Sequence, residues 1–197
     1  MKLNWGERLA VNNPVRPLQQ SLELRLLMKH LKIKPGARIL EIGCGRGAGA
    51  LLISSMFRPW RIHATDLDME MIRLACDYLK PEDRAVMDFS LADAAGLPFS
   101  DGSMEAVFGF GVLHHIPDWQ AALKEVVRVL KPGGMYFFEE LFPSLYQNFL
   151  TRHILLHPEG NRFISRELKD AMNHAGFSIG KYFEVPLMLI FGVASKT

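Results

Sequence analysis

A glycine-rich turn after a short apolar run is the first stretch of this sequence that suggests chemistry. Residues 39–49 read ILEIGCGRGAG, with glycine at every second position from Gly43 to Gly49. Such a turn lets the backbone approach a ligand closely. Residues 43–48 fit the dinucleotide pattern G-x-G-x-x-G/A, Asp66 stands where that pattern expects an acid, and no Gly-Lys-Ser/Thr of a phosphate-binding loop follows. The turn predicts a nucleotide-like ligand and by itself leaves open which one.

Histidines and glutamates further along the chain are the candidates for acid–base chemistry. His114 and His115 follow one apolar run, and Glu139 and Glu140 stand at the end of another. A histidine beside a substrate can accept its proton, and a carboxylate can orient a hydroxyl or an amine. Each of these side chains could equally have a structural or solvated role. The irregular segment that follows contains two more histidines, for which a surface position is favoured: His153 and His157.

Composition limits the class of protein and its partners. The chain has 197 residues, 49% hydrophobic and 22% charged, with a formal charge of +2, which predicts one globular domain with a substantial core. The mild basic bias without a basic stripe does not imply a nucleic-acid partner. Cys44 and Cys76 form neither a disulfide framework nor a metal-binding pattern, which favours a reducing cytoplasm and no metal. The beginning of the sequence does not resemble a secretory signal, and the apolar run 185–194 is too short to span a bilayer.

The elements that must position these residues alternate between strand and helix patterns, which favours a parallel sheet built from βαβ units. The predicted strands cover residues 38–42, 61–66, 86–91, 104–108, 135–141, 177–185 and 187–196. The predicted helices cover 19–31, 48–57, 69–79 and 117–130, followed by one that starts with Ser165 as its N-cap and stops at Gly176. The last two strands meet at Pro186, which favours an antiparallel hairpin. The glycine turn follows the first strand, and ligands of such sheets bind at the carboxyl ends of the strands.

Several motifs in order resemble the class I S-adenosylmethionine-dependent methyltransferase family, over about residue 31 to the end of the sequence. ILEIGCGRG resembles the first motif of that family and ATDLD its acidic second motif. LADAAGLPFSDGSMEAVF resembles the adenine-binding segment, and GVLHHIPDWQAALKEVVRVLKPGG resembles the stretch after the fourth strand. The LPF and LHHI features are most similar to small-molecule methyltransferases of the ubiquinone/menaquinone-biosynthesis type.

The resemblance implies an α/β fold: a doubly wound, Rossmann-like, mostly parallel seven-stranded sheet with a C-terminal antiparallel hairpin and helices on both faces. It implies one methyltransferase domain over 1–197, in which we expect residues 1–30 to form an N-terminal helical cap. Residues 142–164, together with the region of Trp5, are expected to form a substrate lid, whose apolar side chains suggest a small, partly hydrophobic acceptor. No nucleic-acid module accompanies these motifs.

The same resemblance assigns S-adenosyl-L-methionine as cofactor and S-adenosyl-L-homocysteine as product. Asp66 would bind the two ribose hydroxyls, and Leu67 would cover the adenine, whose amine Asp93 would bind. Gly43 and Gly45 would make room for the methionyl part, whereas Gly47 and Gly49 would serve the packing of the fold. The remaining expected contacts are Glu41 at the ammonium group, the Ala94 backbone at a ring nitrogen, and Gly109 near the methionyl group.

The predicted function is transfer of a methyl group to a small molecule by in-line displacement at the sulfonium. Orientation supplies most of the catalysis in such a reaction, so a general base, with His114 or His115 as the candidates, is needed only for some acceptors. One alternative is an NAD(P)-dependent oxidoreductase, although no tyrosine is followed by a lysine four residues on. A second alternative is a non-catalytic cofactor-binding sensor or partner protein.

Overall fold

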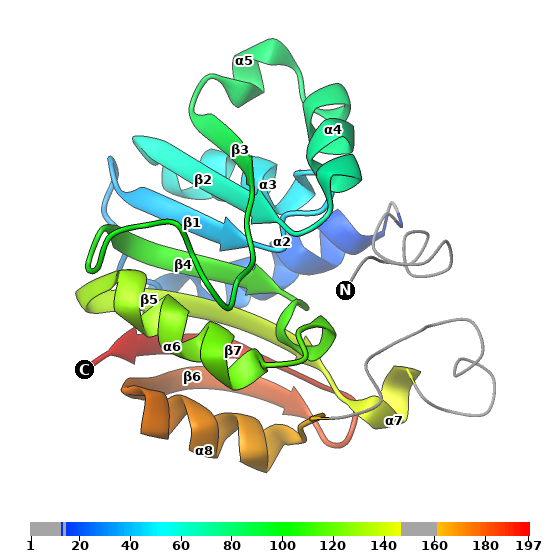
Figure 1. Ribbon diagram of the computed structural model, residues 1–197, viewed down its shortest axis with the longest axis vertical. Coiled ribbons are helices and arrows are strands. Elements are labelled where there is room, and N and C mark those ends of the chain that lie inside the picture. Colours follow the sequence, from blue (N-terminus) through cyan, green and yellow to red (C-terminus); the bar gives the residue numbers. More distant parts are fainter. Residues whose placement is uncertain (1–12, 14, 147–160) are drawn as a thin grey trace.

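The structure, a computed structural model, describes residues 13, 15–146 and 161–197 (Figure 1). Its single sheet has seven strands in the order β3-β2-β1-β4-β5-β7-β6. The five strands from β3 to β5 are parallel, and β7 runs antiparallel to both β5 and β6. The predicted fold class is confirmed, including the C-terminal hairpin.

The strands lie close to the predicted ranges, because short runs bounded by turn residues are typical of strands, and those of the sheet centre are also buried on both faces. They are β1 (Arg38–Ile42), β2 (Arg61–Asp66), β3 (Met87–Leu91), β4 (Met104–Phe110), β5 (Leu130–Leu141), β6 (Phe177–Val185) and β7 (Leu189–Lys196). The main difference is β5, which was expected to begin at Met135. It begins at Leu130, which pairs with Met104 before a register shift brings Met135 opposite Ala106.

The helices are α2 (Arg16–Leu27), α3 (Ala48–Phe57), α4 (Met69–Tyr78), α5 (Pro81–Arg84), α6 (Trp119–Val129), α7 (Pro143–Tyr146) and α8 (Ser165–Ala175), with 3₁₀ turns η1 (Met28–His30) and η2 (Leu113–His115). Asp118 caps α6, as expected, by accepting a hydrogen bond from the Ala121 N–H at 3.0 Å. Ser165 is the first residue of α8 and not its cap. There Glu167 accepts a hydrogen bond from the Ile164 N–H at 3.0 Å, so the glutamate closes this helix end.

Helices cover both faces of the sheet, as Figure 1 shows with α6 and α8 in front and α2 and α3 behind. Successive strand residues divide between the two cores, since side chains alternate along a strand. Ile39 and Phe108 pack on the side of α2 and α3, while the neighbouring Leu40 and Val107 pack on the side of α6 and α8. This double burial fixes the carboxyl ends of β1 to β5 along one edge of the sheet.

Helix α2 differs most from its prediction. It begins at Arg16, and the leucine spacing that predicted it marks the buried side only in part: Leu27 and Leu31 are buried, whereas Leu22 and Leu26 are exposed. Its buried residues are Gln20, Glu23, Leu24 and Leu27. The inward side of the first two turns is therefore polar, a feature that the hydrophobic pattern alone would not predict.

Two predicted features lie wholly or partly outside the described residues. These are the N-terminal part of the expected cap (residues 1–12 and 14, with Trp5) and the central part of the expected lid (residues 147–160, with His153 and His157). Across the described ranges, no helix combines the length and apolar character needed to cross a membrane.

A single arginine fastens the loop between β3 and β4 to α6. The Arg128 guanidinium donates to the carbonyl oxygens of Leu97 and Phe99 at 2.9 and 2.7 Å, and to the carboxylates of Glu125 and Asp101 at 2.7–2.8 Å. Glu125 in turn accepts the Leu97 N–H at 2.7 Å. This loop runs directly after Asp93 and Ala94, so Arg128 also steadies the predicted adenine-binding segment.

We expect Arg128→Ala to lower the free energy of unfolding by about 2–3 kcal/mol, because two carbonyl groups and a carboxylate lose charge-assisted hydrogen bonds. Urea unfolding monitored by tryptophan fluorescence would measure this. Arg128→Lys should recover little of the loss, since an ammonium group cannot reproduce the planar fork. Arg166→Ala, which removes an exposed pair with Asp170 on α8, is the control and should cost less than about 0.5 kcal/mol. Equal stabilities of the two alanine variants would contradict the role of Arg128.

Candidate functional site

A cavity of about 730 Å³ opens at the carboxyl edge of the parallel strands. It lies where the order of the strands reverses between β1 and β4, the place at which open α/β sheets bind their ligands. Segments after β1, β2, β3 and β4 line it, with the beginning of α2 and a few residues near the β5–β7 end of the sheet completing the wall. The volume suits a cofactor or small ligand.

Asp66, at the end of β2, is held rigidly with its carboxylate toward this cavity. Its two oxygens accept the N–H groups of Gly45 and Asp68, each at 2.9 Å. Burial raises the pKa of Asp66, and these N–H groups offset part of that rise. A carboxylate has about four acceptor positions, so Asp66 keeps capacity for further donors such as a pair of hydroxyl groups.

Glu41 lies at the end of β1 under the glycine turn and is 2% exposed. One carboxyl oxygen accepts the backbone N–H of Ala50 and sits where a Cβ on Gly49 would come within 2.0 Å of it, which explains why residue 49 is glycine. The other oxygen, Oε2, lines up with no hydrogen-bond donor in the described part of the chain. Burial, and next the Asp66 carboxylate, raise the pKa of Glu41 well above its usual range. A cationic ligand group beside Glu41 would stabilise the ionised form of this buried carboxyl.

The glycine turn makes room for a ligand at its start and for packing at its end. Gly43 and Gly45 line the cavity with φ angles of +67° and +52°, in the left-handed region that favours glycine. A Cβ on Gly43 would also meet Val112 Cγ2 at 2.4 Å. A Cβ on Gly47 would instead meet Leu79 Cδ1 at 2.9 Å, which agrees with the predicted packing role of that residue.

Cys44 does not have the environment of a nucleophile. Cys44 is buried in the turn, and burial, followed by the charges of Glu41 and Asp66, raises the pKa of its thiol. A thiol held in its protonated form is unreactive. Both Cys44 and Cys76 are free. No group of three His, Cys, Asp or Glu side chains suited to a metal is found in residues 13, 15–146 and 161–197.

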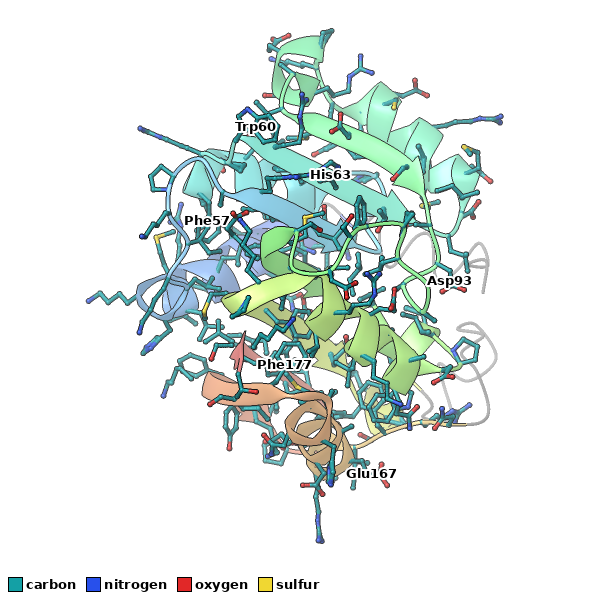
Figure 2. The ribbon with its side chains drawn as sticks, turned by 60° about the vertical axis from the view of Figure 1, so that its left-hand side comes forward. Phe57, Trp60, His63, Asp93, Glu167 and Phe177 are labelled. Atoms are coloured by element: carbon teal, nitrogen blue, oxygen red, sulfur yellow. The ribbon has the colours of Figure 1, made fainter. Side chains whose placement is uncertain are left out.

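The other end of the cavity is formed by the loops after β2 and β3. Leu67, Asp93 and Ala94 line it together, as the sequence predicted for an adenine pocket. Figure 2 shows Asp93 on the loop after β3, at the carboxyl edge of the sheet, while Trp60 marks the opposite edge. The Asp93 carboxylate accepts the Ala95 N–H at 2.9 Å, which fixes its direction.

Gly109, predicted near the methionyl group, lies within β4 and is not among the residues that line the cavity. A Cβ there would come within 3.1 Å of the Tyr136 hydroxyl oxygen, so the glycine accommodates that ring. Gly111, two residues later, lines the cavity with φ +68°. It is the glycine at this strand end that the sequence analysis missed.

His114 and His115 both line the cavity from η2, with their ring centroids 4.2 Å apart. His114 is buried, and its Nδ1 lies 2.8 Å from Glu140 Oε2. Glu140 also accepts the N–H groups of Leu113 at 2.9 Å and His114 at 3.2 Å. Burial raises the pKa of Glu140 to about 8, against the opposing effect of these donors. Glu140 therefore orients the turn that presents both histidines.

A buried ionic cluster joins α2 to the end of β5. Arg16 pairs with Glu139, and Gln19 Nε2 donates to Glu23 at 2.8 Å and to Glu139 at 3.4 Å. Burial, and next the negative charge of Glu139, raise the pKa of Glu23 to about 8. Arg16, Gln19 and Gln20 line the cavity. None of these three residues was predicted, because the helix ahead of the first motif carries no sequence pattern that points to a site.

We expect the protein to lose stability as pH rises from 6.5 to 8. The pKa values of Glu23 and Glu140 are about 8 in the folded chain, well above about 4.3 in an unfolded one, so the folded state binds more protons across that interval. Their contribution is complete below about pH 4 and disappears as pH rises through 8. The lowered pKa of His63, caused by burial, acts in the opposite direction but mainly below pH 6.5.

The measurement is the free energy of unfolding in urea at pH 6.5 and pH 8.0, with an expected decrease on the order of 2 kcal/mol. The double variant Glu23→Gln, Glu140→Gln should weaken this dependence, while Glu41, whose pKa is also raised by burial, retains part of it. Stability that rises over the interval in the unsubstituted chain would show that these carboxyl groups are ionised throughout.

Comparison with known proteins places this geometry in a family. The family model described as "Methyltransferase domain" matches residues 40–138, half of the chain. The sequence is 31% identical over 122 residues to phosphoethanolamine N-methyltransferase 2 of Caenorhabditis elegans, covering 62% of this chain and 28% of that protein. It is 35% identical over 108 residues to a fatty-acid O-methyltransferase of Mycolicibacterium smegmatis, covering 55% and 38%. The chain thus spans roughly a third of the length of these relatives.

Solved structures share the fold over almost the whole chain. A SAM-dependent methyltransferase from Aquifex aeolicus superposes with a TM-score of 0.76 at 18% identity and covers 100% of both chains. The [4+2]-cyclase SpnF superposes with a TM-score of 0.73 at 18% identity, covering 91% of this chain and 81% of that one. A fold that serves different reactions does not by itself fix an activity. The matched family and the site at the strand ends agree, and the chain belongs to the methyltransferase domain family.

Proposed function

We propose that the cavity binds S-adenosylmethionine and that the chain transfers its methyl group to a small, partly hydrophobic acceptor. The observation that supports this most directly is the lining of one cavity by Asp66 and Glu41: a carboxylate with spare acceptor positions and a buried carboxyl whose Oε2 lacks a donor in the described structure. The cofactor offers ribose hydroxyls to the first and an ammonium group to the second. The residues present therefore fit it.

The bound cofactor supplies an electrophilic methyl group on a sulfonium. The chain's own residues orient the cofactor and the acceptor, and they exclude water. Asp66 and the loop around Asp93 hold the nucleoside, while Gly43 and Gly111 let the backbone come close where the methionyl part would lie. Apolar side chains at the far end would take the acceptor: Val112, Ile116, Leu141, Leu145 and Leu189.

We infer that α2 and the segment after β5 form the cap and the lid that the sequence predicted over 1–30 and 142–164. The described parts support this, since Arg16, Gln19 and Leu145 line the cavity. The names of two related proteins indicate small-molecule acceptors for those proteins, phosphoethanolamine and a fatty acid. We propose a small-molecule acceptor for this chain as well. Resemblance to the ubiquinone/menaquinone type stays a prediction. Two free cysteines favour a reducing cytoplasm as the location.

The family match argues against the oxidoreductase alternative. A calorimetric titration with the ligands of both enzyme classes separates an oxidoreductase from a methyltransferase. We expect S-adenosylhomocysteine to bind and NAD(P) to give no heat. Absence of S-adenosylhomocysteine binding would overturn the assignment. Methyl transfer from a radiolabelled donor to a panel of fatty acids, phenols and amines tests the catalytic step. Binding without transfer to any member of the panel would favour the non-catalytic alternative.

A further inference from the structure

The first two turns of helix α2 face the protein with polar side chains, whereas Leu24 and Leu27 further along the helix are buried. Its inward stripe has the spacing i, i+3, i+4, i+7: Arg16, Gln19, Gln20 and Glu23. On the outward side, Leu18, Leu22 and Leu26 are 72%, 59% and 49% exposed. A surface helix normally buries its apolar stripe. The inward polar stripe therefore costs stability and calls for a function.

Gln20 is the member of the stripe whose hydrogen bonding is incomplete. Arg16 pairs with Glu139, and Gln19 donates to Glu23 and Glu139. Gln20 is 6% exposed and lines the cavity, yet its Oε1 accepts no hydrogen bond from any described residue. A buried amide oxygen without a donor has lost its hydration and gained no hydrogen bond in return, which destabilises the folded chain. A ligand that brings a donor into the cavity would remove this cost.

The position of α2 indicates which part of the ligand meets Gln20. The nucleoside belongs at Asp66 and Asp93, after β2 and β3, so the amino-acid part extends toward the ends of β1 and β4. Arg16 lies at that end, with Nη2 3.4 Å from the Phe110 carbonyl oxygen and 3.0 Å from where a Cβ on Gly111 would be. Gln20 follows Arg16 by one helical turn on the same face and lines the same cavity.

Within the amino-acid part, the α-ammonium group provides N–H donors, whereas the carboxylate provides acceptors alone. We propose that Gln20 is a cofactor-binding residue whose Oε1 accepts a hydrogen bond from the α-ammonium group of the methionyl part. Glu41 Oε2 is a second donor-less oxygen of the same cavity, and an ammonium group has three N–H donors, enough to serve both oxygens. This inference rests on the proposed function, because it requires S-adenosylmethionine or its product in the cavity.

The test is a cycle of one substitution and one change in the ligand, measured by calorimetry. Gln20→Met keeps the length of the side chain and removes the oxygen. The ligands are S-adenosylhomocysteine and its deaminated analogue, in which hydrogen replaces the α-amino group. We expect the unsubstituted chain to bind the analogue 10- to 100-fold more weakly, and Gln20→Met to lose about tenfold for S-adenosylhomocysteine and almost nothing for the analogue.

Gln120→Met is the matched control, since that amide pairs with Asn161 outside the cavity, and it should change neither affinity. Thermal unfolding of each variant verifies the fold. Equal loss for both ligands in Gln20→Met, or loss for neither, would overturn the assignment of Gln20. Failure of the unsubstituted chain to bind S-adenosylhomocysteine would instead overturn the proposed function, so the two failures are distinguishable.

Discussion

Asp66→Ala is expected to weaken binding of S-adenosylhomocysteine at least about 100-fold. Two charge-assisted hydrogen bonds to ribose hydroxyls would disappear, each worth about 1.5–3 kcal/mol. The N–H groups of Gly45 and Asp68, now fixed by this carboxylate at 2.9 Å, would lose their acceptor as well. The glycine turn would then be less ordered in the free protein, which adds to the loss. Calorimetric titration measures the effect directly.

Two further variants separate the ribose contacts from the support of the turn. Asp66→Asn retains one oxygen and the side-chain volume, and should lose about tenfold. Asp88→Ala removes an aspartate on the neighbouring strand that pairs with Arg61 and His63 and does not line the cavity, so its affinity should match that of the unsubstituted chain. An Asp66→Ala protein that binds within threefold of the unsubstituted chain would exclude Asp66 from ribose recognition.

The sequence predicted the sheet well, because most strands are separate, largely apolar runs closed by turn residues. The boundaries of β1, β2 and β6 agree with the structure. The error in β5 has a local cause. The segment from Lys131 to Gly134 reads as a turn, and Gly133 does adopt φ +72°, but the strand ladder already begins at Leu130 on the near side of it. Pairing across strands decides such cases, and the local sequence does not contain it.

The cofactor end of the site could also be predicted, since its residues belong to motifs with fixed spacing. Asp66, Leu67, Asp93 and Ala94 do line one cavity. The strand end after β4 was less readable. Gly109 does not line the cavity and Gly111 does, because which glycine of "GFGV" faces the cavity depends on the strand's pleat and on the Tyr136 ring beside Gly109.

The polar wall on α2 could not be predicted from the hydrophobic pattern. The leucines at 22 and 26 imply a buried face that the folded helix turns to solvent. The inward orientation follows from contacts far apart in sequence: Arg16 meets Glu139 across 123 positions, and both are fixed only when the sheet has formed. Glu139 and Glu140, for which a solvated role was an open alternative, are instead fully buried.

Glu140→Ala should lower the free energy of unfolding by about 3–5 kcal/mol, the largest stability effect that we expect in this chain. The substitution removes the acceptor of the Leu113 and His114 N–H groups and the Glu140 partner of His114 Nδ1, all in a buried site. Breaking a buried polar network by removing one partner costs this much because the remaining groups are neither bonded nor hydrated. Since these groups form η2, the two histidines would also lose their fixed position at the cavity.

Urea unfolding measures the stability, and two variants show which property of Glu140 matters. Glu140→Gln keeps one acceptor oxygen for the backbone N–H groups of η2 and replaces the other oxygen with an amide NH₂ group. This NH₂ group would face a backbone N–H group that is itself a donor, so the substitution should cost about 1–2 kcal/mol. Glu184→Ala removes a partly exposed pair with Lys169 and should cost under about 1 kcal/mol. A Glu140→Ala protein as stable as the Glu184→Ala control would mean that apolar packing of Leu113 alone holds the shape of η2. That result would contradict the stabilising role of the Glu140 hydrogen bonds.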